Sequence, residues 1–277
     1  MKKHILFALT TLFILSSCAK DKKDVVITMK TSYGDMKIIL FEETPLHKAN
    51  FIKLAEDGQY DSTVFHRIIK EFMIQGGNVD EKNGTRSNET IPAEFVDGFY
   101  HEKGALAAAR QGDRSNPEKA SSWCQFYIVD GKKWTEAELT VDQRKLNQAI
   151  GQLMQYESQA DLRDQFMELQ NNQDHDGMNK LALEYVDLAE KELNIKLKKE
   201  VDPERLKKYA EVGGTPHLDG AYTVFGKVVE GLDVIDKIAE VETGRADKPI
   251  DPIYMTLEIE RLSKKKITKL YGYEYPE

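Results

Sequence analysis

A single arginine interrupts a long apolar run over residues 63–78. The run is rich in β-branched, aromatic and long aliphatic side chains and closes on Gly76-Gly77, so it predicts one buried strand or a pair of strands. Arg67 is the exception, because a guanidinium keeps its proton and is costly to bury without a partner. Either it faces a cleft, where it is a fixed hydrogen-bond donor, or it lies on an edge strand with its charge in solvent. The local pattern leaves both readings open.

The same run carries two motifs, FHRII at residues 65–69 and FMIQGG at residues 72–77. Both resemble the signature of the cyclophilin family of peptidyl-prolyl isomerases. Similar segments follow in the order typical of that family, so that the resemblance covers residues 25–130 and 214–262 with one long interruption. These further segments are residues 91–95, 104–109, 125–128, 218–220 and 224–228.

The chemistry that the resemblance implies is rotation about the peptide bond that precedes proline. This rotation has a barrier of about 18 to 20 kcal/mol, and it requires no nucleophile, metal or proton transfer. Twisting localises the lone pair of the proline nitrogen, so a donor aimed at that atom stabilises the transition state more than the ground state. Arg67 is the predicted donor. No cofactor is expected.

The resemblance also implies an apolar pocket for the proline ring and a groove for the flanking peptide. Strand alternation independently places Met73 with Gln75, and Gln125 with Tyr127, on common faces, but it does not place Phe72. Taken singly, each apolar residue of the set is more simply a core residue. The predicted site residues are Arg67 as the catalytic residue and, for substrate binding, Phe72, Met73, Gln75, Ala109, Gln125, Tyr127, His217, Leu218 and Tyr222.

Four positions depart from the family's pattern. Tyr127 stands where phenylalanine is usual, and its hydroxyl is tolerated if it reaches water. Tyr222 replaces a pocket histidine, and its polar tip can do similar work. His217 replaces the tryptophan on which strong cyclosporin binding depends, which predicts weak inhibition by that compound. Arg110 replaces an asparagine beside the groove, which favours acidic substrates.

The elements that position these residues are predicted from hydrophobic periodicity. A helix is predicted over residues 46–57, entered through Pro45 and ended by Gly58, and another over 231–239. Many short strands with two helices suit the architecture of the family: mainly β with α, a closed antiparallel β-barrel capped by helices. Strands are predicted at residues 25–31 and 36–41, which form a hairpin, and at 105–109, 125–129, 223–229 and 253–259.

One long insertion, residues 131–213, is not explained by the resemblance and has helical spacing. Thr135 begins a capping box, and Asp202-Pro203 has the cap and first-turn proline that start a short helix. Gly213-Gly214 returns the chain to the barrel. The sequence therefore predicts an inserted helical hairpin that projects from the barrel.

The amino terminus has the pattern of an export signal. Lys2-Lys3 precede an apolar stretch, residues 5–15, that is too short to cross a bilayer as a helix. The sequence Leu-Ser-Ser-Cys that follows resembles the bacterial lipobox, which predicts lipidation of Cys18; an ordinary signal peptide with an incidental cysteine is the alternative. A lipid on Cys18 would place the protein in the bacterial cell envelope, periplasmic or associated with the outer membrane.

These observations predict a division of the whole chain. The expected parts are a lipoprotein signal peptide at 1–17, a tether at 18–24, the isomerase domain at 25–262 with its insertion at 131–213, and a C-terminal tail at 263–277.

The composition of the chain indicates which kinds of partner it is expected to bind. The net charge of −8 argues against a nucleic-acid partner, and the six histidines have no ligand-like spacing, so no metal is expected. The expected partners are proline-containing polypeptides and the membrane, through the lipid. The predicted function is isomerisation of X-Pro bonds in envelope proteins, assisting their folding. The alternative is a catalytically weak binding module or chaperone whose helical insertion engages a partner protein.

Overall fold

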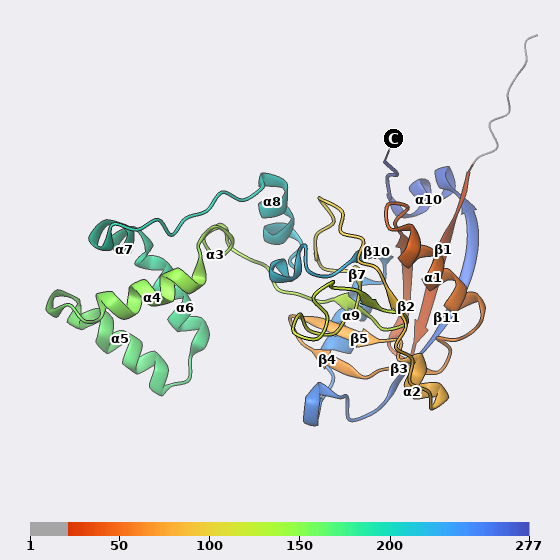
Figure 1. Ribbon diagram of the computed structural model, residues 1–277, viewed down its shortest axis with the longest axis horizontal. Helices are drawn as coiled ribbons and strands as arrows, with labels where there is room; N and C mark the ends of the chain where they lie inside the picture. The colour runs from red at the N-terminus through yellow and green to blue at the C-terminus, as the bar shows by residue number, and fades with distance from the viewer. Residues whose placement is uncertain (1–21, 277) are drawn as a thin grey trace, which may run out of the picture.

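The computed structural model describes residues 22–276, and its largest part is one antiparallel sheet (Figure 1). Its nine strands are β1 (Lys23–Thr31), β2 (Gly34–Leu40), β3 (Thr63–Phe65), β4 (Arg67–Ile69), β5 (Met73–Gly76), β7 (Ala105–Ala108), β9 (Phe126–Val129), β10 (Val224–Glu230) and β11 (Ile253–Ser263). They are hydrogen-bonded in the order β3-β11-β1-β2-β10-β7-β9-β5-β4. The two end strands, β3 and β4, follow each other in the chain with only His66 between them. The sheet therefore curves into a nearly closed barrel, which confirms the predicted architecture.

Two helices cover the barrel where the periodicity predicts them. They are α1 (Pro45–Glu56) and α9 (Leu232–Ala239). A shorter helix, α2 (Val79–Asn83), and a separate two-stranded ladder of β6 (Thr90–Ile91) with β8 (Ser121–Ser122) lie in the connections.

Phe51 of α1 anchors the helix to the barrel core. Its ring centroid lies 4.9 Å from that of Tyr60, 5.4 Å from Phe126 and 5.5 Å from Phe225, and all four side chains are buried. Aromatic pairs at such separations stabilise a core beyond the area that they bury. The aromatic cluster therefore fixes α1 against strands that come from both sides of the insertion.

The insertion is built of more helices than the predicted hairpin. They are α3 (Glu136–Thr140), α4 (Gln143–Leu153), the 3-10 turn η1 (Glu157–Gln159), α5 (Ala160–Asn171), α6 (His175–Glu184), α7 (Val186–Leu193) and α8 (Pro203–Glu211). The predicted capping box at Thr135 and the cap at Asp202 are both present. The helices break at extended Val141 and Tyr156 and at Gln173, whose φ is 55°. These local breaks turn the hairpin into a bundle.

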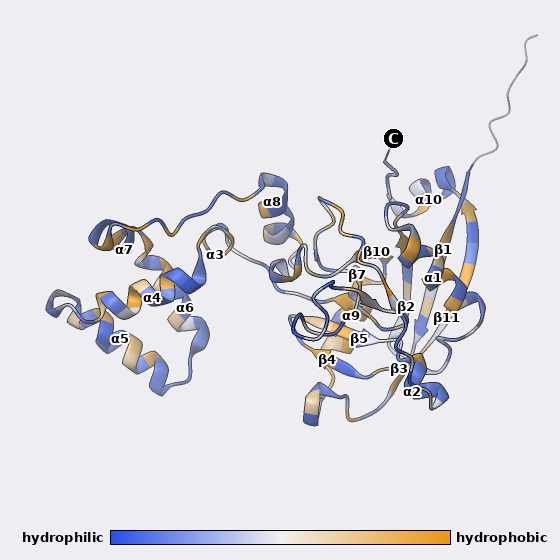
Figure 2. Cartoon of the chain, viewed as in Figure 1, coloured by the Kyte–Doolittle hydropathy of each residue, from blue (hydrophilic) through white to orange (hydrophobic). Residues whose placement is uncertain are grey.

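We call residues 142–197, which contain α4 to α7, the lobe. Figure 1 shows the lobe set away from the barrel, with α8 between them, and Figure 2 shows apolar and polar residues alternating along its helices. Leu146, Leu153 and Leu162 are fully buried in a separate small core. A neck closes the lobe, because Val141 pairs with Lys198. The lobe is therefore a unit whose two ends lie side by side.

The segment predicted as a C-terminal tail, residues 263–277, contains a helix and contacts the barrel. Residues 264–271 form α10 (Lys264–Tyr271), which is capped by Ser263 and buries Ile267. Beyond it, the Tyr273 ring stacks 6.3 Å from the Phe41 ring. The segment is ordered because its apolar and aromatic residues find partners on the barrel. Part of the predicted tether also belongs to the barrel, since β1 begins at Lys23.

The signal peptide predicted at 1–17 and Cys18 lie outside the described residues. Over residues 22–276, no helix has both the length and the apolar character needed to cross a membrane.

The insertion leaves and rejoins the barrel at one tight contact between two glycines. Gly214 pairs with both Glu102 and Lys132, and its φ is 145°. A Cβ on Gly214 would lie 2.1 Å from the carbonyl oxygen of His101, and a Cβ on Gly131 would lie 2.3 Å from Cα of Gly214. Only glycine fits at this junction.

Gly214→Ala is expected to lower the free energy of unfolding by about 2 to 4 kcal/mol, because the new methyl group meets backbone atoms that cannot move away. Chemical denaturation followed by circular dichroism measures this. Gly151→Ala in α4 is the matched control, because a Cβ there meets nothing within 4 Å. It should stabilise the chain by about 0.5 to 1 kcal/mol. Equal stability of the two variants would contradict the account of the junction.

Candidate active site

A small cavity of about 110 Å³ opens at the side of the barrel. Its walls come from β4 and β5, from the ends of β7 and β9, and from the segment around the 3-10 turn η2 (Pro216–Leu218). No residue of the insertion, 131–213, lines it. The lining residues are Arg67, Phe72, Met73, Gln75, Ala109, Arg110, Tyr127, Leu218 and Tyr222. The structure thus brings the predicted site residues together at one cavity, with Gln125 and His217 just outside its lining.

Arg67 lies on β4, which forms one end of the strand order and pairs with β5, opposite Gln75. Its side chain is 42% exposed, and its Nε donates to Oδ2 of Asp247 at 3.3 Å. The two readings of the sequence are therefore both partly right, since the residue sits on an edge strand and also borders the cavity. An ion pair this exposed contributes little stability, but it can orient a long side chain.

Asp247 reaches Arg67 from a strained turn. It belongs to the 3-10 turn η3 (Arg245–Asp247), in which Ala246 and Asp247 have φ of 61° and 57°. Left-handed conformations cost free energy in residues other than glycine and often mark functional positions. The N–H of Gly244 donates to the carbonyl of Lys248 at 2.8 Å and closes the turn. Sequence reasoning missed Asp247 because it lies 180 positions from Arg67 and belongs to no motif.

Phe72 sits in the turn between β4 and β5, which is why strand alternation did not place it. Its N–H donates to the carbonyl of Ile69 at 3.1 Å, and the preceding Glu71 has φ of 60°. The carbonyl of Phe72 accepts hydrogen bonds from the N–H groups of Asp130 and Gly131, at the start of the insertion. The opposite wall is formed by η2, whose His217 ring stacks on Phe72 with centroids 5.6 Å apart. Burial lowers the pKa of His217.

A wider groove of about 440 Å³ continues from the cavity and shares Gln75, Ala109 and Arg110 with it, and Gln125 lines the groove alone. The Gln75 amide donates to Oε1 of Gln125 at 3.2 Å, and the N–H of Ala109 donates to the Gln125 carbonyl. Amide side chains and strand ends along an open groove can bind an extended peptide on either side of the residue in the cavity.

Contact with water is the condition under which the sequence predicts that the Tyr127 hydroxyl is tolerated, and the structure satisfies this hydroxyl in another way. The side chain is 4% exposed, and its hydroxyl oxygen lies 3.0 Å from Nε2 of the fully buried His101. Burial raises the pKa of Tyr127 well above its ordinary value, so the hydroxyl keeps its proton. The extra oxygen is thus satisfied inside the protein.

The prediction that Arg110 favours acidic substrates is corrected, because its guanidinium already pairs within the protein. Its Nε donates to the carbonyl of Ala221 at 2.7 Å, and one terminal amino group lies 2.7 Å from the carboxylate of Asp113. The side chain is 4% exposed and its guanidinium lies 4.3 Å from the centre of the Tyr222 ring. Arg110 therefore supports the cavity wall at Tyr222.

Another group of polar side chains has the order of a nucleophilic triad. His47 lies 2.9 Å from the hydroxyl of Ser121 through Nε2 and 2.6 Å from Glu94 through Nδ1. Ser121 and His47 are 1% and 2% exposed, so no substrate reaches them. The Glu94 carboxylate also accepts from the N–H groups of Leu46 and His47 at the start of α1. This group serves to fix α1. Over residues 22–276, no cluster of acidic, histidine or cysteine side chains has the form of a metal site.

The family model for "Cyclophilin type peptidyl-prolyl cis-trans isomerase/CLD" matches residues 26–157 and 190–258. The chain belongs to the cyclophilin family. The internal gap in the match, residues 158–189, lies within the lobe of this cyclophilin.

Curated proteins and a solved structure are also similar. A Streptococcus pyogenes protein, provisionally named a bifunctional phosphatase/peptidyl-prolyl cis-trans isomerase, is 34% identical over 240 residues, which are 84% of this chain and 38% of that protein. A Staphylococcus haemolyticus protein, provisionally named a peptidyl-prolyl cis-trans isomerase, is 28% identical over 86% of this chain and 92% of its own. A Cryptosporidium parvum cyclophilin structure has a TM-score of 0.50 at 19% identity, covering 86% of this chain and 98% of that one. It shares the fold.

Asp247→Asn is expected to lower kcat/KM for a proline peptide by about two- to fivefold, because the pair that orients Arg67 is an exposed one. Asparagine keeps the shape of the side chain and tolerates the left-handed backbone. Asp251→Asn, an exposed residue four positions along the same connection, is the control. A protease-coupled peptide assay compares them, and equal rates for both variants would show that Asp247 does not orient Arg67.

Proposed function

We propose that this cyclophilin accelerates the rotation of X-Pro bonds in extended or unfolded polypeptides of the bacterial cell envelope, and that the predicted residues around the cavity carry the reaction. The observation on which the proposal rests is the position of Arg67, a half-exposed cation that lines a small cavity together with Phe72, Met73 and Leu218.

The cavity suits a proline ring in size and polarity. An engineered apolar cavity of about 150 Å³ holds benzene, so a space of about 110 Å³ is suitable for a ring of five atoms. Phe72, Met73 and Leu218 offer apolar walls. Holding the ring there while the peptide lies in the groove beside Gln75 and Gln125 fixes one side of the bond and leaves the other free to turn.

Arg67 then supplies the selective interaction. In the planar amide the proline nitrogen accepts no hydrogen bond, whereas in the twisted amide its lone pair is available to a guanidinium N–H. The donor therefore stabilises the transition state above the ground state. Each 1.4 kcal/mol or so of such stabilisation accelerates the reaction about tenfold. Within residues 22–276, the single side-chain hydrogen bond of Arg67 is made by Nε, so the terminal amino groups remain for the substrate.

The envelope location rests on the sequence of the amino terminus, with Lys2-Lys3, the apolar stretch and the lipobox-like segment before Cys18. In the proposal a lipid on Cys18 anchors the protein to a membrane. Metabolic labelling with a radioactive fatty acid tests this, because Cys18→Ala would abolish the label.

Arg67→Ala is expected to lower kcat/KM for a proline peptide by about a hundredfold, the scale of losing one transition-state donor. The fold should persist, since the side chain is 42% exposed. Arg144→Ala removes an exposed arginine of the lobe and should leave turnover unchanged. Both are measured in the peptide assay, with thermal unfolding as the check on folding. Unchanged turnover of Arg67→Ala would refute the mechanism.

A second candidate function is client binding by the lobe. Tyr156, Met167 and Ile195 are 42%, 55% and 39% exposed on it, and Figure 1 shows the lobe set away from the barrel. Exposed apolar side chains of this kind favour contact with unfolded chains.

Replacing residues 142–197 with a short linker at the neck is expected to preserve turnover of a small peptide, because Val141 and Lys198 already lie side by side. Suppression of aggregation of an unfolded protein should be lost if the lobe binds clients. Full suppression without the lobe would exclude this second function.

A further inference from the structure

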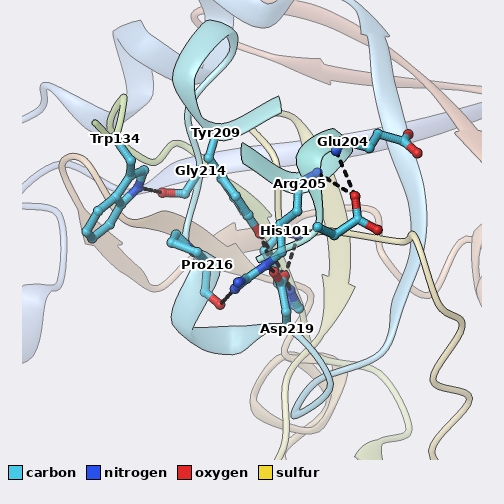
Figure 3. Close-up of polar contacts among 9 residues, drawn as sticks. His101, Trp134, Glu204, Arg205, Tyr209, Gly214, Pro216 and Asp219 are labelled. Atoms are coloured by element: carbon cyan, nitrogen blue, oxygen red, sulfur yellow. Dashed lines mark hydrogen bonds and ion pairs between the residues drawn. The ribbon is translucent and has the colours of Figure 1, made fainter. Parts of the chain in front are cut away.

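The carboxylate of Asp219 joins the barrel to the last helix of the insertion (Figure 3). From the barrel, His101 donates its backbone N–H at 2.9 Å, and its Nδ1 lies 3.0 Å from Oδ1. From α8, Arg205 donates Nε at 2.8 Å and the Tyr209 hydroxyl lies 2.7 and 2.8 Å from the two oxygens. The carboxylate is therefore surrounded by donors from two parts of the chain that are far apart in sequence.

The donors and acceptors of this hydrogen-bond network can be assigned. Burial raises the pKa of Asp219, but the hydrogen bonds from His101, Tyr209 and Arg205 outweigh burial and hold the pKa below its ordinary value. An ionised carboxylate only accepts, so Nδ1 of His101 donates to it. In the neutral ring Nε2 is then the acceptor, and the Tyr127 hydroxyl 3.0 Å away donates to it. Asp219 thereby fixes the orientation of a side chain that lines the cavity.

Asp219 also holds the opposite wall. It follows Leu218, which lines the cavity. Helix α8 contacts the same segment a second time, because Arg205 also donates a hydrogen bond to the carbonyl of Pro216 at 2.7 Å. Trp134, at the other end of the insertion, donates to the carbonyl of Gly214 at 2.8 Å. The root of the insertion therefore sets the separation of Tyr127 and Leu218 without touching the cavity.

We propose that Asp219 is a positioning residue and that α8, through Arg205 and Tyr209, sets the width of the cavity and so its selectivity for the five-membered ring of proline. The inference rests on the proposed function. Tyr209 and Arg205 act through Asp219, and neither lines the cavity. Helix α8 therefore contributes to substrate selectivity, whereas the lobe does not.

The test uses the full chain and two peptides that differ in one residue, proline or its six-membered homologue pipecolic acid. The variants are Tyr209→Phe, which deletes only the hydroxyl on Asp219, and Asp219→Asn. We expect kcat/KM for the proline peptide to fall by about three- to tenfold, mainly through KM. The preference for proline over pipecolic acid should fall by about threefold or more.

Two controls separate positioning from loss of stability. Lys207→Gln changes an exposed residue of α8, two positions from Tyr209, and should alter neither the rate nor the preference. Leu146→Ala opens the core of the lobe and should lower Tm while leaving the preference unchanged. A variant that kept the unsubstituted preference while still folded would overturn the inference. If Asp219→Asn does not fold, Tyr209→Phe alone decides.

Calorimetric titration of both peptides keeps this inference separate from the proposed function. A chain that binds the peptides without turning them over would refute the proposed catalysis. The ratio of the two dissociation constants would still test the width of the cavity, and an identical ratio in Tyr209→Phe would overturn the inference.

Discussion

In the proposed mechanism Arg67 has to stay charged, hold one direction and border a cavity with apolar walls, and these three requirements conflict. An edge strand resolves the conflict. On β4 the guanidinium keeps part of its hydration, while pairing with β5 aligns it with Gln75 along the cavity. The Asp247 carboxylate pairs with the guanidinium from a turn in which Ala246 and Asp247 have left-handed backbones. The barrel thus presents a half-exposed cation at a small cavity whose other walls include Phe72, Met73 and Leu218.

The walls of the cavity are held by contacts that lie outside the sheet. Phe72 is fixed through its carbonyl by the first residues of the insertion, and Leu218 is fixed through Asp219 by the last helix of the insertion. His217 links the two sides by stacking on Phe72. A segment that looks in the sequence like an addition to the barrel is therefore joined at both ends to the site. The two glycines at the junction allow its ends to lie close enough for this.

Sequence alone identified the parts of the site that lie in short motifs. Strand spacing placed Met73 on one face with Gln75, but the local pattern left the position of Arg67 open. The barrel and the cavity were predicted from the resemblance of these runs to cyclophilin motifs. The roles of Asp247, His101 and Asp219 could not be predicted, because each acts through a contact with a segment that is distant in the chain. Arg110 was assigned wrongly because its partners, such as the carbonyl of Ala221, leave no trace in side-chain patterns. The predicted helical hairpin has fewer helices than the insertion, because single residues such as Gln173 break helices locally.

The strand order has a consequence for how the chain folds. Strand β10 lies between β2 and β7, although the whole insertion separates it from them in sequence. The contacts that form the core of the lobe all lie within one continuous segment of the chain. Contacts that are near in sequence form faster than distant strand pairings. Once the lobe has formed, its neck holds Val141 beside Lys198. The loop that must close before β10 can pair with β2 and β7 is then much shorter. A folded insertion thus lowers the entropic cost of closing a barrel whose strands are far apart in the chain.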